Sequence, residues 1–190
     1  MNGPDDEEGY LIFEQPAGDG LVFSIGLDVT PRDWGISLDP SVGVIHSRVS
    51  GLAASFLGLT EGACVVGASL TDLFPAQGRE GGLVPRWAVL SRGDIEAVVQ
   101  LLLSDLRDVG LPFLRAFTSL TEMARHLEGV AKSQFDWGNL AILYAELGRF
   151  DQCVSVLNRM MVGADSEPSF VAEQTRQFVV RLREHYRLPA

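Results

Sequence analysis

His46 is the residue of this sequence whose type and setting come closest to those of a catalytic group. It ends a predicted strand and is followed by Ser47. A histidine held beside a carboxylate, here Asp28 or Asp39 brought close by a sheet, could act as a general base. Neighbouring residues on a strand point to opposite faces, however, so His46 is badly placed to activate Ser47. We therefore interpret His46 as a structural or surface residue, with partner binding as the alternative.

The motifs that hold phosphates, nucleotides or metals have strict spacing, and none of them occurs here. The sequence has no Gly-x-x-x-x-Gly-Lys loop, no Gly-x-Gly-x-x-Gly fingerprint, no Gly-x-Ser-x-Gly elbow and no His-Glu-x-x-His helix. Its two cysteines, Cys64 and Cys153, are far apart and form no zinc-binding set. We predict no catalytic residue, no cofactor and no metal, and therefore a protein that is not an enzyme.

The charge of the chain is strongly acidic and unevenly distributed. The 190 residues carry a formal net charge of −10. Residues 1–90 contain 12 acidic and 4 basic residues, a net charge of −8, and residues 91–190 contain 13 and 11, a net charge of −2. Such a chain is poorly suited to nucleic acid or to an anionic membrane, since phosphate contacts need Lys or Arg. It suits a basic protein partner, although simple solubility would explain the charge as well.

The N-terminal residues and the hydropathy of the chain suggest where the protein resides. Residues 1–9 form a flexible acidic lead without the basic and apolar regions of a signal peptide. No apolar run reaches the roughly 18 residues of a membrane span. The expected location is the cytoplasm, with no membrane contact.

Period-two hydrophobicity predicts strands in the first half. An apolar run at 10–13, an alternating segment at 21–29 and further segments at 34–38, 42–46, 63–70 and 84–90 have this character. Only residues 47–57 change to a helical period, and Gly58 is a suitable stop.

Helical periodicity dominates the second half. Capping boxes beginning at Ser91 and Ser119 precede apolar helical stripes, and Gly110 with Pro112 is expected to end the first helix. Asp136 is a candidate N-cap, and Ser166 with Pro168 is placed to begin the last helix. The order predicts an α+β fold, an antiparallel or mixed sheet followed by a helical half. We expect one domain at 10–190, β-rich over 10–90 and helical over 91–190.

Residues 137–157 read as two helices joined by a tight turn at Gly148. The pattern Trp137, Leu140-Ala141, Tyr144, Gly148, Phe150, Cys153 and Leu157 resembles a tetratricopeptide repeat, with cysteine at the usual alanine and without the closing proline. No second copy follows at the 34-residue period, and a repeat array needs about three units. An ordinary helix pair in a core is therefore the leading interpretation, and a divergent peptide-binding array is the alternative.

Two further segments, 39–49 and 111–117, resemble parts of small uncharacterised bacterial proteins of immunity-protein type. This resemblance implies a module that neutralises a toxin or effector by occluding it. Carboxylates would steer a basic partner and an aromatic anchor would supply affinity. The candidate partner-binding residues are Asp28, Asp33, Trp34, Asp39 and His46.

Two other hypotheses remain open. One is a scaffold subunit of a larger bacterial assembly that uses the helical hairpin at 137–157. The other is an enzyme with dispersed active-site residues, His46 with Asp28 or Asp39. Attraction between the acidic first half and the basic last turn near His185 would also permit a homodimer.

Overall fold

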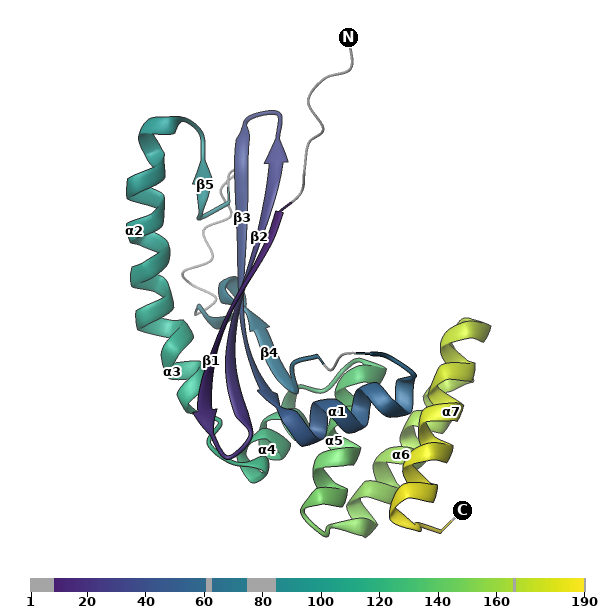
Figure 1. Cartoon of the computed structure of the whole chain (residues 1–190). Coiled ribbons are helices and arrows are strands. Elements are labelled where there is room, and N and C mark those ends of the chain that lie inside the picture. The colour runs from purple at the N-terminus through teal and green to yellow at the C-terminus, as the bar shows by residue number, and fades with distance from the viewer. Residues whose placement is uncertain (1–8, 61–62, 75–84, 166, 190) are drawn as a thin grey trace. The chain divides into compact units, whose positions relative to one another are not determined.

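The computed structural model describes residues 9–60, 63–74, 85–165 and 167–189 and has an α+β fold (Figure 1). An N-terminal antiparallel sheet precedes a helical half, which confirms the predicted fold class. The strands are β1 (Gly9–Gly18), β2 (Leu21–Arg32), β3 (Gly35–His46), β4 (Val66–Ser69) and β5 (Ala88–Val89). The α-helices are α1 (Ser47–Leu57), α2 (Ile95–Asp105), α3 (Leu111–Arg115), α4 (Leu120–Val130), α5 (Gln134–Glu146), α6 (Phe150–Ala164) and α7 (Ser169–Tyr186).

The sheet is built on the long strands β1, β2 and β3, which follow one another in space as in sequence. The strand order is β1-β2-β3-β4, and β5 pairs antiparallel with β3 at Ile36 and Ser37. Asp19 and Gly20, both with positive φ, form the turn between β1 and β2. β1 therefore extends beyond the apolar run at 10–13 as far as Gly18.

The segments predicted at 34–38 and 42–46 belong to one strand, β3, so the expected break at Asp39-Pro40 is wrong. A proline has no N–H for a sheet ladder, which is why the sequence suggests an interruption. In β3 the ladder to β5 involves Ile36 and Ser37 and does not use Pro40. The predicted strands at 63–70 and 84–90 are shorter than expected, since β4 and β5 cover only Val66–Ser69 and Ala88–Val89.

Gly110 and Pro112 do not end the first long helix, contrary to the prediction. Helix α2 runs without a break through a π-helical segment, Leu106–Gly110, into α3. The π turn places Pro112 in the first turn of α3, where its missing N–H costs little. Gly110 is buried, and a Cβ there would lie 3.3 Å from both Val42 and Leu70, so glycine permits the close packing of this segment on the sheet.

Contacts divide the chain into two compact units, which we describe separately. The sheet unit contains residues 1–16, 23–43 and 67–116, and the helical unit contains residues 17–22, 44–66 and 117–190. Each unit therefore draws on both the β-rich segment 10–90 and the helical segment 91–190.

The core of the helical unit is α5, which α1, α4, α6 and α7 all contact. Every residue from Gly138 to Ala145 is buried. Among them, the Asn139 side-chain amide donates to the Val65 carbonyl oxygen at 3.3 Å. Gly148, with φ of 70°, ends α5, and Arg149 N–H donates to the Tyr144 oxygen at 2.8 Å. The predicted helix pair and its turn are thus present.

Local capping signals predict the N-terminus of one helix and the C-terminus of another correctly. In another helix the N-cap lies at a different residue from the predicted one. Ser119 caps α4 by accepting from Glu122 N–H, and Gly58 ends α1 with φ of 72°, both as predicted. Asp136 is the third residue of a capping box whose N-cap is Ser133, so its expected N-cap role is wrong by three positions. Ser166 lies outside the described residues, and Pro168 directly precedes α7.

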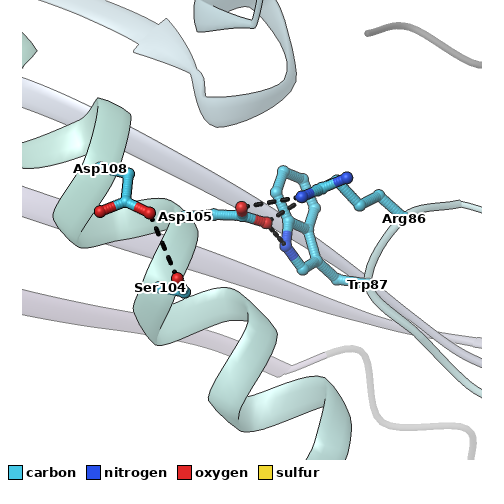
Figure 2. A network of polar contacts seen from close by, with 5 residues as sticks. All are labelled: Arg86, Trp87, Ser104, Asp105 and Asp108. Carbon is cyan, nitrogen blue, oxygen red and sulfur yellow. Dashed lines mark hydrogen bonds and ion pairs between the residues drawn. The ribbon is translucent and has the colours of Figure 1, made fainter.

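A polar network joins the entry of β5 to α2 within the sheet unit (Figure 2). The Asp105 carboxylate is 5% exposed and accepts from Arg86 Nε at 2.7 Å, Arg86 Nη2 at 2.9 Å and Trp87 Nε1 at 2.9 Å. The hydrogen bonds from Arg86 hold the pKa of Asp105 below its usual value, against the opposing effect of burial. Trp87 also accepts from Leu38 N–H through its carbonyl, so the network fixes β5 against β3.

Replacing Asp105 tests this network. Asp105→Ala removes the carboxylate that accepts from Trp87 and Arg86, and we expect it to lower the free energy of unfolding by about 1–3 kcal/mol. Urea denaturation at neutral pH measures the difference. Asp108→Ala is the matched control on the same helical run: its exposed carboxylate accepts from Ser104 at 3.3 Å (Figure 2), and we expect a change below about 0.5 kcal/mol.

The stability difference between the wild-type protein and Asp105→Ala depends on pH in a defined way. Because the folded pKa of Asp105 is lowered, its contribution is complete above the unfolded value of 3.8 and is lost as the pH falls through the folded value. The stability difference between the wild-type protein and Asp105→Ala should therefore shrink only in acid below about 3.8. A difference of unchanged size throughout that acid range would contradict the assigned role.

Candidate protein-interaction surface

The apolar residues of β1 are exposed on both sides of the strand. Tyr10, Leu11, Ile12 and Phe13, which we call the apolar edge segment, are 62%, 50%, 56% and 58% exposed. Successive residues of a strand point to opposite faces, so a strand with one covered face would alternate between buried and exposed residues. In β1 every position from Tyr10 to Gly18 is exposed instead. Four large apolar side chains of β1 therefore face solvent.

β1 also stands at an edge of the sheet, with β2 as its neighbour. An edge strand presents backbone N–H and C=O groups that can pair with another extended chain. Proteins commonly block such edges with charged residues, proline or a bulge. The apolar edge segment contains neither a charge nor a proline, and Glu14 and Pro16 come only after it. Its chemistry is that of a strand able to accept another strand.

Tyr10 packs β1 against its neighbour β2. Its hydroxyl lies over Gly26 of β2, where a Cβ would be 2.5 Å from the Tyr10 oxygen and 2.6 Å from Ser41 Oγ of β3. Glycine at 26 thus gives the tyrosine its place on the sheet. The contact anchors one end of the apolar edge segment while most of its surface remains open.

Four of the predicted site residues lie on the hairpin formed by β2 and β3. Asp33 and Trp34 form its two-residue turn, and both are exposed. The two strands have equal length, and Gly26 faces Ser41, so the same register places Asp28 opposite Asp39. Both carboxylates are exposed, and Asp39 accepts from Ser37 Oγ at 3.2 Å. The hairpin thus pairs two carboxylates across the strands and presents Asp33 with an aromatic residue at its turn.

His46, the fifth predicted residue, belongs to the helical unit, whereas Asp28 and Asp39 belong to the sheet unit. It is half-buried and is the N-cap of α1, where Nδ1 accepts from Val49 N–H at 3.4 Å. Burial lowers the pKa of His46, while the nearby Glu146 carboxylate opposes that effect. The ring nitrogen that a general base would need is therefore partly committed to the cap. The carboxylate that acts on His46 is Glu146 rather than an aspartate of the hairpin.

Glu146 belongs to a cluster that the sequence did not indicate. Its carboxylate pairs with Arg48 Nε of α1 at 2.5 Å and accepts a hydrogen bond from the Tyr186 hydroxyl of α7. Burial and this hydrogen bond raise the pKa of Tyr186. The three residues come from distant parts of the sequence, so no spacing rule could have joined them. They connect α1, α5 and α7, which is a structural role within the helical unit.

The apolar edge segment was also not among the predicted site residues. The sequence signal was available, since four consecutive apolar residues directly follow the acidic run at 5–8. This signal predicts a strand but does not indicate what covers the strand. Exposure on both faces appears only when the neighbouring elements are placed.

Comparison with known proteins adds nothing to this geometry, because no family model, curated protein or solved structure matches the chain. The resemblances to a tetratricopeptide repeat and to immunity proteins therefore stay predictions. No helix of the described residues is both long and apolar enough to cross a membrane. Within the same residues, no group of three or more His, Cys, Asp or Glu side chains could hold a metal ion.

The capping role of His46 has a consequence for acid stability. The unfolded histidine takes up a proton below its ordinary pKa of 6.5, whereas the folded one resists protonation, so acidification from pH 7 to 5 should destabilise the fold. His46→Asn keeps an N-cap side chain that can accept from Val49 N–H. We expect it to retain stability at pH 7 and to show a weaker loss at pH 5.

Urea denaturation at both pH values measures this effect. Burial also lowers the pKa of His126, which contributes in the same direction, so His126→Gln is the parallel control. Replacing His126 should leave unchanged the part of the acid destabilisation that is due to His46. An unchanged pH dependence in His46→Asn would contradict the assignment.

Proposed function

We propose that this chain is a non-catalytic protein-binding module that captures a partner along β1. The observation that carries the proposal is the exposure of Tyr10, Leu11, Ile12 and Phe13 on an edge strand. An extended segment of the partner would add a strand to the sheet through main-chain hydrogen bonds, and its side chains would lie against the apolar edge segment. This mode needs no catalytic group and no cofactor.

The apolar contacts contribute substantially but do not suffice alone. Complete burial of a large apolar side chain is worth about 1.5–3 kcal/mol, and roughly half of each of these four is still open to solvent. Covering them would contribute about 3–6 kcal/mol in total. Association itself costs about 4 kcal/mol or more. The main-chain hydrogen bonds and the charges of the partner must therefore decide whether binding is stable.

The charge pattern favours a basic partner. The run Asp5-Asp6-Glu7-Glu8 directly precedes β1 in sequence, and Asp28 of β2 faces Asp39 of β3. Together with a net charge of −10, these carboxylates would attract a cationic protein and hasten the encounter. We propose that the module neutralises a basic toxin or effector by occluding its surface, as an immunity protein does.

Ile12→Lys tests the strand-addition mode. A lysine placed among the apolar side chains should block pairing, and we expect a tagged Ile12→Lys protein to lose the partner that the wild-type protein retains. Leu90→Lys is the matched control, because Leu90 is also apolar and 56% exposed but lies outside β1. Pull-downs from the native host at low and at high salt, with partners identified by mass, make the comparison.

The outcomes separate the proposals. A single basic partner that is lost at high salt, lost in Ile12→Lys and kept in Leu90→Lys supports strand addition, and co-expression should then rescue growth from that partner's toxicity. Retention of the partner by Ile12→Lys would exclude β1. If the wild-type protein forms a dimer in solution that Ile12→Lys abolishes, the strand pairs with a second copy instead.

The helical hairpin supports a second candidate, a scaffold subunit that contacts an assembly through residues 137–157. Although the middle of α5 is buried, Phe150 at the start of α6 is 45% exposed. We expect Phe150→Ser to remove a salt-resistant set of several partners if this candidate holds. The same variant should leave strand addition at β1 unchanged.

A further inference from the structure

The helical unit contains an apolar cavity that the proposed binding at β1 does not use. It has a volume of about 210 Å³ and lies among α1, α5, α6 and α7. Its walls are mainly carbon and include Ala53, Leu57, Met160, Val171 and Phe178. A cavity of about 150 Å³ with such walls is known to hold benzene, so this one admits a phenyl ring or a branched aliphatic group.

A second hollow of about 550 Å³ shares part of its wall with the first. Gln134, Phe135, Met160 and Val171 line both spaces. The second hollow has a different chemistry, because Lys132, Arg159 and Glu167 also line it. The two spaces together thus form a site with an apolar inner end and a charged outer end.

Arg159 is the best-positioned charge at the outer end. Its guanidinium lies over the Trp137 ring, 4.5 Å from the ring centre, which orients the planar group. Among the described residues, no carboxylate pairs with it. A guanidinium held flat in this way presents its N–H groups for bidentate recognition of a carboxylate. Lys132 adds a second positive charge, and the single negative charge of Glu167 leaves this lining net positive.

Gln134 carries a second, independent indication at the junction of the two spaces. Its side-chain Oε1 is buried and has no hydrogen-bond partner in the described part of the chain. A buried acceptor without a donor costs roughly 1–3 kcal/mol, so native structures rarely keep one without a reason. Gly163 makes room for this side chain, since a Cβ there would lie 2.9 Å from Gln134 Nε2. A ligand N–H or O–H that displaces the covering side chains would satisfy the unpaired lone pairs of Oε1.

We propose that this site binds a small carboxylic acid that carries a compact apolar group and an N–H or O–H donor close to the carboxylate. The apolar group enters the inner cavity, the carboxylate meets Arg159 and Lys132, and the donor reaches Gln134 Oε1. A cationic ligand is disfavoured by the net positive lining. A purely apolar ligand would fill the inner cavity but would leave both polar features unused.

Three probes separate these contributions. The anion 3-phenylpropanoate has the ring and the carboxylate, its primary amide lacks the charge, and 2-hydroxy-3-phenylpropanoate adds an uncharged O–H donor beside the carboxylate. Isothermal titration calorimetry on the full chain at low salt should give a Kd of about 1 mM or tighter for 3-phenylpropanoate, as expected for a ligand of this size. We expect the amide to bind about fivefold or more weakly, since it makes no charge-assisted hydrogen bond.

The neutral hydroxyl of 2-hydroxy-3-phenylpropanoate tests the role of Gln134. Binding tighter than that of 3-phenylpropanoate supports the donor to Oε1, and weaker binding overturns that part of the proposal. Absence of saturable binding of all three probes up to about 10 mM overturns the site as a whole.

Variants locate the binding. Arg159→Gln replaces the guanidinium by a shorter, neutral amide, and we expect it to weaken 3-phenylpropanoate about fivefold while leaving the amide ligand unchanged. Arg125→Gln, an exposed arginine of α4 that lines neither space, is the matched control and should bind as the wild type does. Equal affinity of Arg159→Gln and the wild type would overturn the carboxylate contact.

Ala53→Leu fills the inner cavity, and it should abolish binding of every probe while the protein remains folded, as thermal denaturation can verify. Undiminished binding by a folded Ala53→Leu protein would overturn the inner cavity as the apolar subsite. Because no residue of β1 takes part, failure of this site would leave the capture of a protein partner at β1 unaffected.

Discussion

Burial of α5 on all its sides is the constraint on which the helical unit depends. A helix in a globular protein commonly has one apolar face and one polar face. From Gly138 to Ala145 no position of α5 can be polar without a partner, because α1, α4, α6 and α7 surround it. Asn139 meets this requirement by donating to a backbone carbonyl. Gly138 meets a steric requirement, since a Cβ there would lie 3.1 Å from the Phe178 ring.

This arrangement separates the parts of α5 that support the fold from those that can bind. The middle of the helix is packed, and its two ends carry the polar chemistry. Glu146 at the C-terminal end joins Arg48 and Tyr186, which holds three helices together. At the N-terminal end, Gln134 and Phe135 border the two hollows. Rigid packing between the ends is what gives the hollow end a defined shape.

Local signals made the helices of this chain predictable. Ser119 and Gly58 cap their helices through contacts within one helical turn, so the prediction of these caps does not depend on the remainder of the fold. Pro40 and Pro112 predict interruptions that the structure does not have. A proline disrupts a strand or helix only where its N–H is needed, and that depends on the hydrogen-bond pairing around it. The link of Asp105 to Arg86 and Trp87 joins residues from separate elements, and no periodicity contains it.

The candidate sites were less predictable than the fold for the same reason. Asp28, Asp33, Trp34 and Asp39 could be recognised as exposed turn and strand residues from their local pattern, and all four are exposed. Whether an apolar strand is covered is a property of the assembled sheet. The sequence of β1 was therefore sufficient to predict a strand and insufficient to predict its exposure.

The π turn between α2 and α3 has a consequence for how this chain could tolerate insertion and deletion. A π turn holds one residue more than an α turn, so it is equivalent to a single residue inserted into an otherwise regular helix. Deleting one residue from Leu106–Gly110 would therefore restore a regular α turn, keep the helix continuous and leave the residues after it in nearly the same phase. Leu114, now 1% exposed, would stay in the core. The same deletion in the regular part of α2 would instead rotate everything after it by about 100°. The π turn is thus a place where this helical run can lose one residue without turning α3 away from the sheet.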